Sequence, residues 1–181
     1  MAKSTKVSLT LLGIIIILGF IVVAIVETVK LSYHTVDEAY SELVLKEHGI
    51  RKNQDRLVEK AYYSVERYTF IPYVLNDKVS MLHLEKGFFG WRMRSHYLNF
   101  DANGSSVYSD INNLNGETIL YGVIPENITP EVRVVKIDDM EGKIFKLNER
   151  TSVFLFLTES KDDTKYTGIQ FFDSNGNVIG I

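Results

Sequence analysis

The feature that most constrains this chain is an uncharged run of twenty residues, 7–26, which reads VSLTLLGIIIILGFIVVAIV. A helix of that length is about 30 Å long, which matches the hydrocarbon core of a bilayer. A removable signal peptide has a shorter apolar region, of about 7–15 residues, followed by small residues at its cleavage site. Ile25 and Val26 stand where those small residues would be needed. The run therefore predicts a transmembrane anchor that is retained.

The charges that flank the run predict its orientation. Lys3, Lys6 and the amino terminus precede it, whereas Glu27 and Lys30 cancel after it. Because positive residues favour the cytoplasmic side, the N-terminus is expected inside and the chain from about residue 31 outside. The predicted divisions are a cytoplasmic tail (1–6), the anchor (7–26), a spacer (27–34) and one extracytoplasmic domain (35–181). The predicted location is the cell membrane, with a single span.

The composition of the exterior part narrows the classes of partner. Residues 32–181 contain 17 Lys and Arg against 22 Asp and Glu, a formal charge of −5. A nucleic-acid-binding domain would be expected to be basic, so nucleic acid is not a predicted partner. The chain has no Cys, which excludes disulfides and thiol chemistry. An exterior domain without disulfides is more typical of a bacterial envelope than of an animal cell surface.

A helix is predicted after the spacer, in the stretch TVDEAYSELVLKEHG, residues 35–49. Thr35 is a good N-cap, Glu38 completes a capping box, and Gly49 is placed to end the helix. One face of this helix is apolar, with residues at the spacing of a single stripe: Val36, Ala39, Tyr40, Leu43 and Val44. The stripe indicates a helix that covers the domain's own sheet. The alternative is a helix that binds a groove or a second copy of the chain.

From about residue 56 the period of the apolar residues changes to two, as in β-strands. Pro72 cannot donate a ladder hydrogen bond, so its strand is expected to be an edge strand or bulged. Asn76 and Asp77 form a candidate two-residue turn. Eight or nine short strands are predicted, in the segments 56–75, 78–86, 88–100, 117–124, 131–137, 143–147, 151–158, 165–172 and 178–181. The predicted fold class is α+β, mainly antiparallel, with a sandwich or a strongly bent sheet.

Four stretches carry a resemblance to a known kind of protein: HTVDEA (34–39), LEKGFFGWR (84–92), LYGVI (120–124) and FDSNGNVI (172–179). With them, the chain from about residue 34 to 181 resembles the small, single-pass, membrane-anchored proteins of Gram-positive bacilli and their relatives that carry a β-rich exterior domain. The resemblance implies an envelope location and a non-enzymatic role. It supplies no catalytic residues.

The sequence lacks the short motifs that would indicate catalysis or a cofactor: it has no GxSxG, no HExxH, no glycine-rich phosphate loop and no CxxC. Its histidines, His34, His48, His83 and His96, show no metal-ligand spacing. A Ser/His/carboxylate set could assemble in space from Ser95, His96 and an acidic residue, but the spacing does not favour one. We therefore expect no catalytic site, no metal and no cofactor.

Two polar stretches offer oxygen ligands at alternate positions, as a calcium loop would: DANGS at 101–105 and DSNGN at 173–177. Neither is followed by the acidic residue that closes an EF-hand loop, and Asn-Gly between strands is a strong hairpin signal. Both stretches are therefore predicted to be turns. The acidic pairs at 138–139 and 162–163 are predicted to be solvated turn charges.

The segment KGFFGWRMRSHYLNF, residues 86–100, combines aromatic and basic side chains. In a strand they would alternate between two faces. Phe89, Trp91, Met93 and Tyr97 would then face the core, and the cations would share the opposite, exposed face. These cations are the candidate binding face: Arg92, Arg94 and His96. That face is either simply solvated or a basic stripe for anionic lipid headgroups, a wall polymer or an acidic partner.

The predicted function is a membrane-anchored extracytoplasmic binding or interaction module of a bacterial envelope, without catalysis. Its expected partners are the membrane itself and an envelope protein, anionic lipid or wall polymer. One alternative is a cell-surface hydrolase, which would require a pocket of convergent polar groups with perturbed pKa values. The other alternative is a structural spacer that has no ligand.

Overall fold

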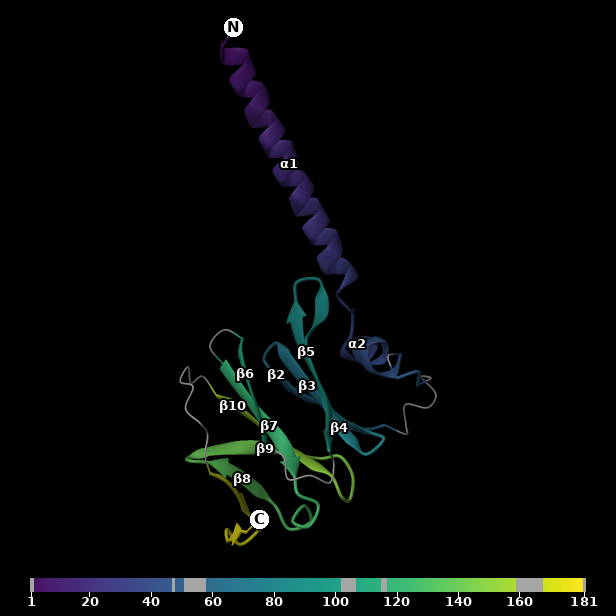
Figure 1. Cartoon of the computed structure of the whole chain (residues 1–181), viewed down its shortest axis with the longest axis vertical. Coiled ribbons are helices and arrows are strands. Elements are labelled where there is room, and N and C mark those ends of the chain that lie inside the picture. The colour runs from purple at the N-terminus through teal and green to yellow at the C-terminus, as the bar shows by residue number, and fades with distance from the viewer. Residues whose placement is uncertain are drawn as a thin grey trace.

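The computed structural model describes residues 2–46, 48–50, 58–101, 107–114, 117–158 and 168–180. A long helix, α1 (Ala2–Lys30), leads into a β-rich domain that carries a short helix on one side (Figure 1). The C-terminus lies at the end of this domain farthest from α1 (Figure 1). The predicted α+β class, with mainly antiparallel sheets, is confirmed.

α1 stands clear of the β-rich domain. Its segment Gly13–Lys30 has a mean hydropathy of 2.4, and none of that segment is buried inside the protein. The exposed fractions of its side chains reach 74% at Phe20 and 61% at Ile17. By length and composition, α1 can cross a membrane. The helix continues to Lys30, which lies in the segment expected to be a spacer.

The helix α2 (Val36–Tyr40) begins at the predicted N-cap, because the Thr35 hydroxyl accepts a hydrogen bond from the Glu38 amide at 3.0 Å. The chain continues as a π-helical turn, η1 (Ser41–Leu45), and Gly49 follows with a φ of +67°. The side that carries the predicted stripe is buried against the first sheet, through Ala39, Tyr40, Val44 and Leu45. The interpretation as a helix that covers its own sheet is therefore confirmed.

The first sheet is antiparallel and contains β1 (Glu59–Lys60), β2 (Tyr63–Val65), β3 (Tyr68–Leu75), β4 (Lys78–Gly87) and β5 (Gly90–Asp101). β3 pairs with β4 on one side and with both β1 and β2 on the other. The prediction of one strand over 56–75 is wrong, because the chain reverses direction at Glu66, whose φ is +51°. β2 thereby pairs back onto β3 as a short hairpin.

Pro72 lies in the middle of β3, which is an interior strand and not the predicted edge strand. The strand on one side of β3 is interrupted between β1 and β2, and there the Ala61 amide donates to the Pro72 carbonyl at 3.1 Å. In antiparallel sheets the N–H and C=O of one residue point to the same neighbour. The position where Pro72 lacks an N–H therefore coincides with the gap in its partner strand.

The two hairpin turns that β4 makes, with β3 and with β5, lie at opposite ends of this strand and differ in composition. The β3–β4 turn is formed by Asn76 and Asp77, as predicted, with φ values of +52° and +58°, as a type I′ turn requires. The β4–β5 turn is formed by Phe88 and Phe89. Phe89 is therefore in a turn and exposed, and the prediction that it faces the core from a strand is wrong.

The second sheet has the strand order β12-β11-β8-β9-β10-β7-β6, and its described pairs are antiparallel. Its strands are β6 (Val107–Leu114), β7 (Glu117–Ile124), β8 (Val134–Ile137), β9 (Met140–Lys146), β10 (Ser152–Thr158), β11 (Ile169–Phe172) and β12 (Val178–Ile179). All of them except β6 were predicted; β7 has the predicted ends, and the others have shifted ends. β6 reads VYSDINNL, in which the apolar residues do not alternate as a strand pattern requires.

Three clusters of buried apolar side chains stabilise the domain. The inter-sheet core takes side chains from both sheets, including Phe70, Met81, Tyr121 and Leu155. The helix-side core lies between the first sheet and the α2–η1 helix. The third cluster, with Phe154 and other side chains of the second sheet, is separate from the inter-sheet core. Both faces of β3 and β4 are consequently buried.

Candidate functional site

β5 contains two register shifts that decide where its side chains point. His83 of β4 pairs with Ser95, but the next residue, Leu84, pairs with Met93. Arg94 is therefore the extra residue of a β-bulge. A second shift lies farther along the strand, between the partners of Val79 and Met81.

The bulge at Arg94 inverts the predicted alternation of β5. Trp91 packs at the helix-side core, whereas Tyr97 lies in the inter-sheet core on the other face. Met93 is 47% exposed. The prediction that these three residues share one buried face is wrong, because one extra residue moves every later side chain to the opposite face.

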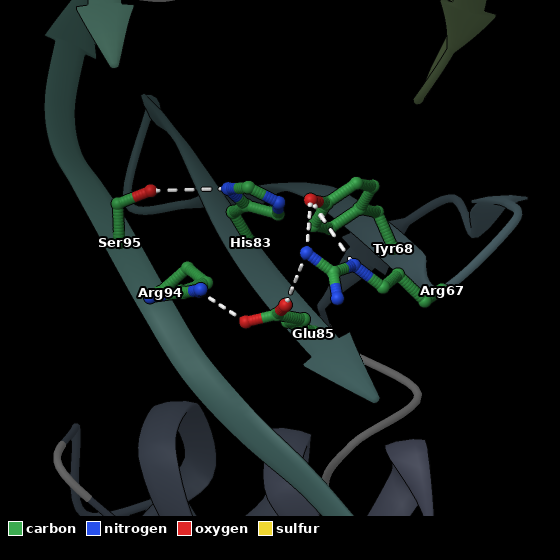
Figure 2. Close-up of polar contacts among 6 residues, drawn as sticks. All are labelled: Arg67, Tyr68, His83, Glu85, Arg94 and Ser95. Atoms are coloured by element: carbon green, nitrogen blue, oxygen red, sulfur yellow. Dashed lines mark hydrogen bonds and ion pairs between the residues drawn. The ribbon is translucent and has the colours of Figure 1, made fainter. Parts of the chain in front are cut away.

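Glu85 of β4 is the centre of a network of charged and polar side chains (Figure 2). Its carboxylate is only 3% exposed. One oxygen, Oε1, pairs with Arg67 Nη2 at 3.0 Å, and the other, Oε2, contacts Arg94 Nε (Figure 2). The Arg67 guanidinium also donates to the Tyr68 hydroxyl at 3.1 and 3.2 Å. A buried carboxylate requires such partners, so these arginines neutralise an internal charge.

His83 lies beside this network and is completely buried. Its ring stacks on Phe70 with a centroid distance of 4.4 Å, and Nδ1 lies 3.3 Å from the Ser95 hydroxyl (Figure 2). Burial and, to a smaller extent, the nearby Arg94 cation lower the pKa of His83 to about 4, although the Glu85 carboxylate acts in the opposite direction. His83 is therefore neutral at pH 7.

The three residues of the candidate binding face do not form one stripe. Arg94 is held by Glu85 in the bulge. The His96 Nε2 atom lies 2.7 Å from the Tyr73 hydroxyl and is half-buried on the helix side of the sheet. Arg92 is also half-buried, with its guanidinium close to Gly87.

Arg92 and Arg94 instead border one groove next to the C-terminal end of α1, which we call the foot of α1. The groove has a volume of about 340 Å³ and lies where the end of α1, η1 and β5 come together. Its lining combines apolar side chains with two guanidinium groups: Leu31, Tyr33, Leu43, Arg92, Met93 and Arg94. Arg92 and Arg94 border this groove on either side of Met93. The combination suits a ligand with an anionic group and an apolar part.

Of the two polar stretches considered as calcium loops, the structure describes 173–177 completely and only the first residue of 101–105. In the described part of the C-terminal turn, Asp173 Oδ1 accepts hydrogen bonds from the amides of Asn175 and Asn177 at 2.8 and 2.9 Å. This is the geometry of the predicted turn, and the side-chain bond from Asn177 lowers the pKa of Asp173. The acidic pair 138–139 lies in an exposed turn, as predicted. Most of 101–105 and all of 162–163 lie outside the described residues.

No group of three or more potential metal ligands occurs among the residues that the structure describes. No known protein family matches this chain, and no curated protein or solved structure is significantly similar to it. The resemblance to membrane-anchored proteins of Gram-positive bacilli therefore stays a prediction.

Sequence reasoning missed His83, Glu85 and Arg67 as members of a network. The signal was present in β4, which reads KVSMLHLEKG. Apolar residues occupy both alternating sets of positions in it, which indicates a strand buried on both faces. Polar side chains within such a strand must be buried with partners.

Proposed function

We propose that this protein is a membrane-anchored, extracytoplasmic binding module of a bacterial envelope. The observation that carries the proposal is α1, an apolar helix whose segment Gly13–Lys30 is not buried inside the protein. An apolar surface of this size needs cover from water, and a bilayer is the cover that its length fits.

The orientation and the compartment are inferred from charge and composition. Lys3 and Lys6 favour a cytoplasmic N-terminus, so the β-rich domain would lie outside. The domain has three buried clusters and no Cys, which suits an envelope where disulfides are not needed for stability. We also infer that the two sheets form a sandwich, and their shared inter-sheet core supports this.

The groove at the foot of α1 is the candidate binding site. It places Arg92 and Arg94 next to exposed Leu31 and Met93. An anionic envelope ligand, such as a lipid headgroup, a wall polymer or an acidic protein segment, would fit this lining. The groove favours a binding module over a spacer without a ligand.

A cell-surface hydrolase is the weaker alternative. The contact between His83 and Ser95 resembles a catalytic pair, but a general base should have a pKa near the working pH and access to substrate. His83 is completely buried and its pKa is lowered to about 4. Both oxygens of the neighbouring Glu85 are held by arginines, so this carboxylate is not available to orient the imidazole.

Cysteines placed on the two sides of α1 test the proposal, because only those outside should react with an impermeant thiol reagent on intact cells. The chain has no Cys of its own, so each introduced residue is a unique label.

A further inference from the structure

Two phenylalanines form the tip of the β4–β5 hairpin. Phe88 is 96% exposed and Phe89 is 39% exposed, and their rings lie edge to face with centroids 5.1 Å apart. Two-residue turns normally use Asn, Asp or Gly, as the turn at Asn76 and Asp77 does at the other end of the sheet. Neither phenylalanine belongs to a buried cluster of the described chain. Folding of the domain therefore does not account for them.

The backbone holds this tip beside the end of α1. Tyr33, just after the helix, forms an isolated β-bridge with Trp91, in which the two amides donate to the two carbonyls at 2.8 and 2.7 Å. Gly90 permits this approach, since a Cβ atom there would lie 2.3 Å from the Tyr33 carbonyl oxygen. Figure 1 shows the hairpin directed toward α1, with its tip beside the C-terminal end of the helix.

The reach of the hairpin sets the depth of the tip. From Trp91 to the tip is three residues, about 10 Å at the rise of a β-strand. Tyr33 is bridged to Trp91, so the same length can be counted from Tyr33 back along the chain toward α1. At a helical rise of about 1.5 Å per residue, it ends at about the last turn of the helix. The tip is therefore level with the end of the apolar helix, where a bilayer crossed by α1 would have its headgroup layer.

The side chains next to the tip have the chemistry of residues at a membrane surface. The Lys86 ammonium lies 5.9 Å from the centroid of the Trp91 ring. Leu31 is 68% exposed on the same side, at the end of α1. Tryptophan and tyrosine are enriched at membrane–water interfaces, phenylalanine is among the residues that interfacial segments bury in the headgroup region, and lysine or arginine beside them is attracted to anionic headgroups.

We propose that the Phe88–Phe89 tip inserts into the outer headgroup layer of the same membrane that α1 crosses. The tip is then a second membrane contact, which fixes the orientation of the β-rich domain and turns the groove of Arg92 toward the lipid surface. This inference rests on the proposed function, because it requires α1 to span the bilayer. Its occupant is lipid, since the tip lies at the level of the helix end and not on a side of the domain.

The test uses the full chain reconstituted into vesicles of three parts phosphatidylcholine to one part phosphatidylglycerol. An environment-sensitive fluorophore is attached to Phe88→Cys, to Asp77→Cys at the opposite end of the sheet, or to Ile17→Cys within α1. Nitroxide-bearing lipids then quench the label at shallow or deep positions. The Phe88→Cys label should shift its emission to the blue and be quenched by shallow nitroxides. The Asp77→Cys label should behave as in water.

The Ile17→Cys label separates the two proposals. If it is quenched by deep nitroxides while the Phe88→Cys label behaves as in water, the insertion of the hairpin is overturned and the anchor stands. If the Ile17→Cys label is not quenched, the proposed function is overturned, and the hairpin proposal with it. Protection of the Phe88→Cys label in native membranes but not in pure lipid would indicate a protein partner, and would also overturn the proposal.

A label-free measurement guards against an effect of the dye. Trp91 is the only tryptophan in the chain. Its fluorescence should be quenched by lipids brominated near the headgroup, and most of that quenching should be lost in Phe88→Ser/Phe89→Ser. Unchanged quenching in this variant would contradict insertion by the phenylalanines. Far-ultraviolet circular dichroism of the variant should match the parent, because the replaced side chains are exposed.

Discussion

At the scale of single residues, Glu85 decides what the nearby cations do. A carboxylate on a residue that is only 3% exposed would be costly without partners, and Arg67 and Arg94 supply them. Arg92, two positions earlier in the strand, has no ion pair among the described residues. Two arginines of the same candidate face therefore have different roles.

This difference predicts unequal effects of replacing the two arginines. Arg94→Ser should lower the free energy of unfolding by about 1–3 kcal/mol, because it removes one partner of a buried charge while Arg67 remains. Arg92→Ser, the matched control, should change it by less than about 1 kcal/mol. Urea unfolding of residues 32–181 measures both. Equal effects would show that Glu85 does not depend on Arg94.

The burial of His83 predicts a dependence of stability on pH. Its pKa is about 4 in the folded protein and 6.5 when unperturbed, so between these values only the unfolded chain takes up the proton. Stability should be complete above about pH 6.5 and fall by about 1.4 kcal/mol per pH unit as the pH drops toward 4. His83→Gln should flatten the curve between pH 7 and 5, whereas the exposed His34→Gln should not. A flat curve in the parent protein would refute the assignment.

At the scale of elements, the sequence predicted caps, turns and individual strands correctly, but it did not predict which face of a strand each side chain occupies. The Thr35 cap, the Asn76–Asp77 turn and β7 follow from short patterns whose chemistry is complete within a few residues. The bulge at Arg94 has no signal in the sequence of β5 itself, because an extra residue can be recognised only when the strand is aligned with its partner β4. The reversal at Glu66 was missed for the same reason, since its φ of +51° is imposed by the pairing of β2 with β3.

The candidate site was predicted only in part. Arg92 and Arg94 were singled out from composition, and they do border a groove. His96 was grouped with them by alternation, but the bulge places it at Tyr73 instead. The groove itself depends on the meeting of α1, η1 and β5, which a linear pattern cannot contain.

The bridge between Tyr33 and Trp91 predicts a sensitive position at Gly90. Gly90→Ala should destabilise residues 32–181 by about 1–3 kcal/mol, since its φ of +129° is strained for alanine and the new Cβ would overlap the Tyr33 carbonyl oxygen. Gly180→Ala, with nothing within 4 Å of its Cβ, is the control. Thermal unfolding compares them. A tolerated Gly90→Ala would mean that the foot of α1 is not fixed to β5.

At the scale of the whole molecule, the chain divides its apolar surface between two environments. The β-rich domain buries apolar side chains in three clusters and has no disulfides. α1 leaves its apolar side chains exposed, with fractions of 44–74% from Ile14 to Val29. This division was predictable because twenty uncharged residues need no tertiary information to be recognised. The proposal that the domain lies outside a membrane rests on flanking charge alone.

The most direct test of the account is the accessibility of single cysteines at the two ends of the chain. Ser174→Cys lies in an exposed turn near the C-terminus, and Ser4→Cys lies at the start of α1. The Cys-free parent gives the background of the assay. On intact cells, an impermeant maleimide should label Ser174→Cys, and should label Ser4→Cys only after the membrane is permeabilised. The reverse pattern, or a mature protein that begins near residue 27, would contradict an anchored domain outside the membrane.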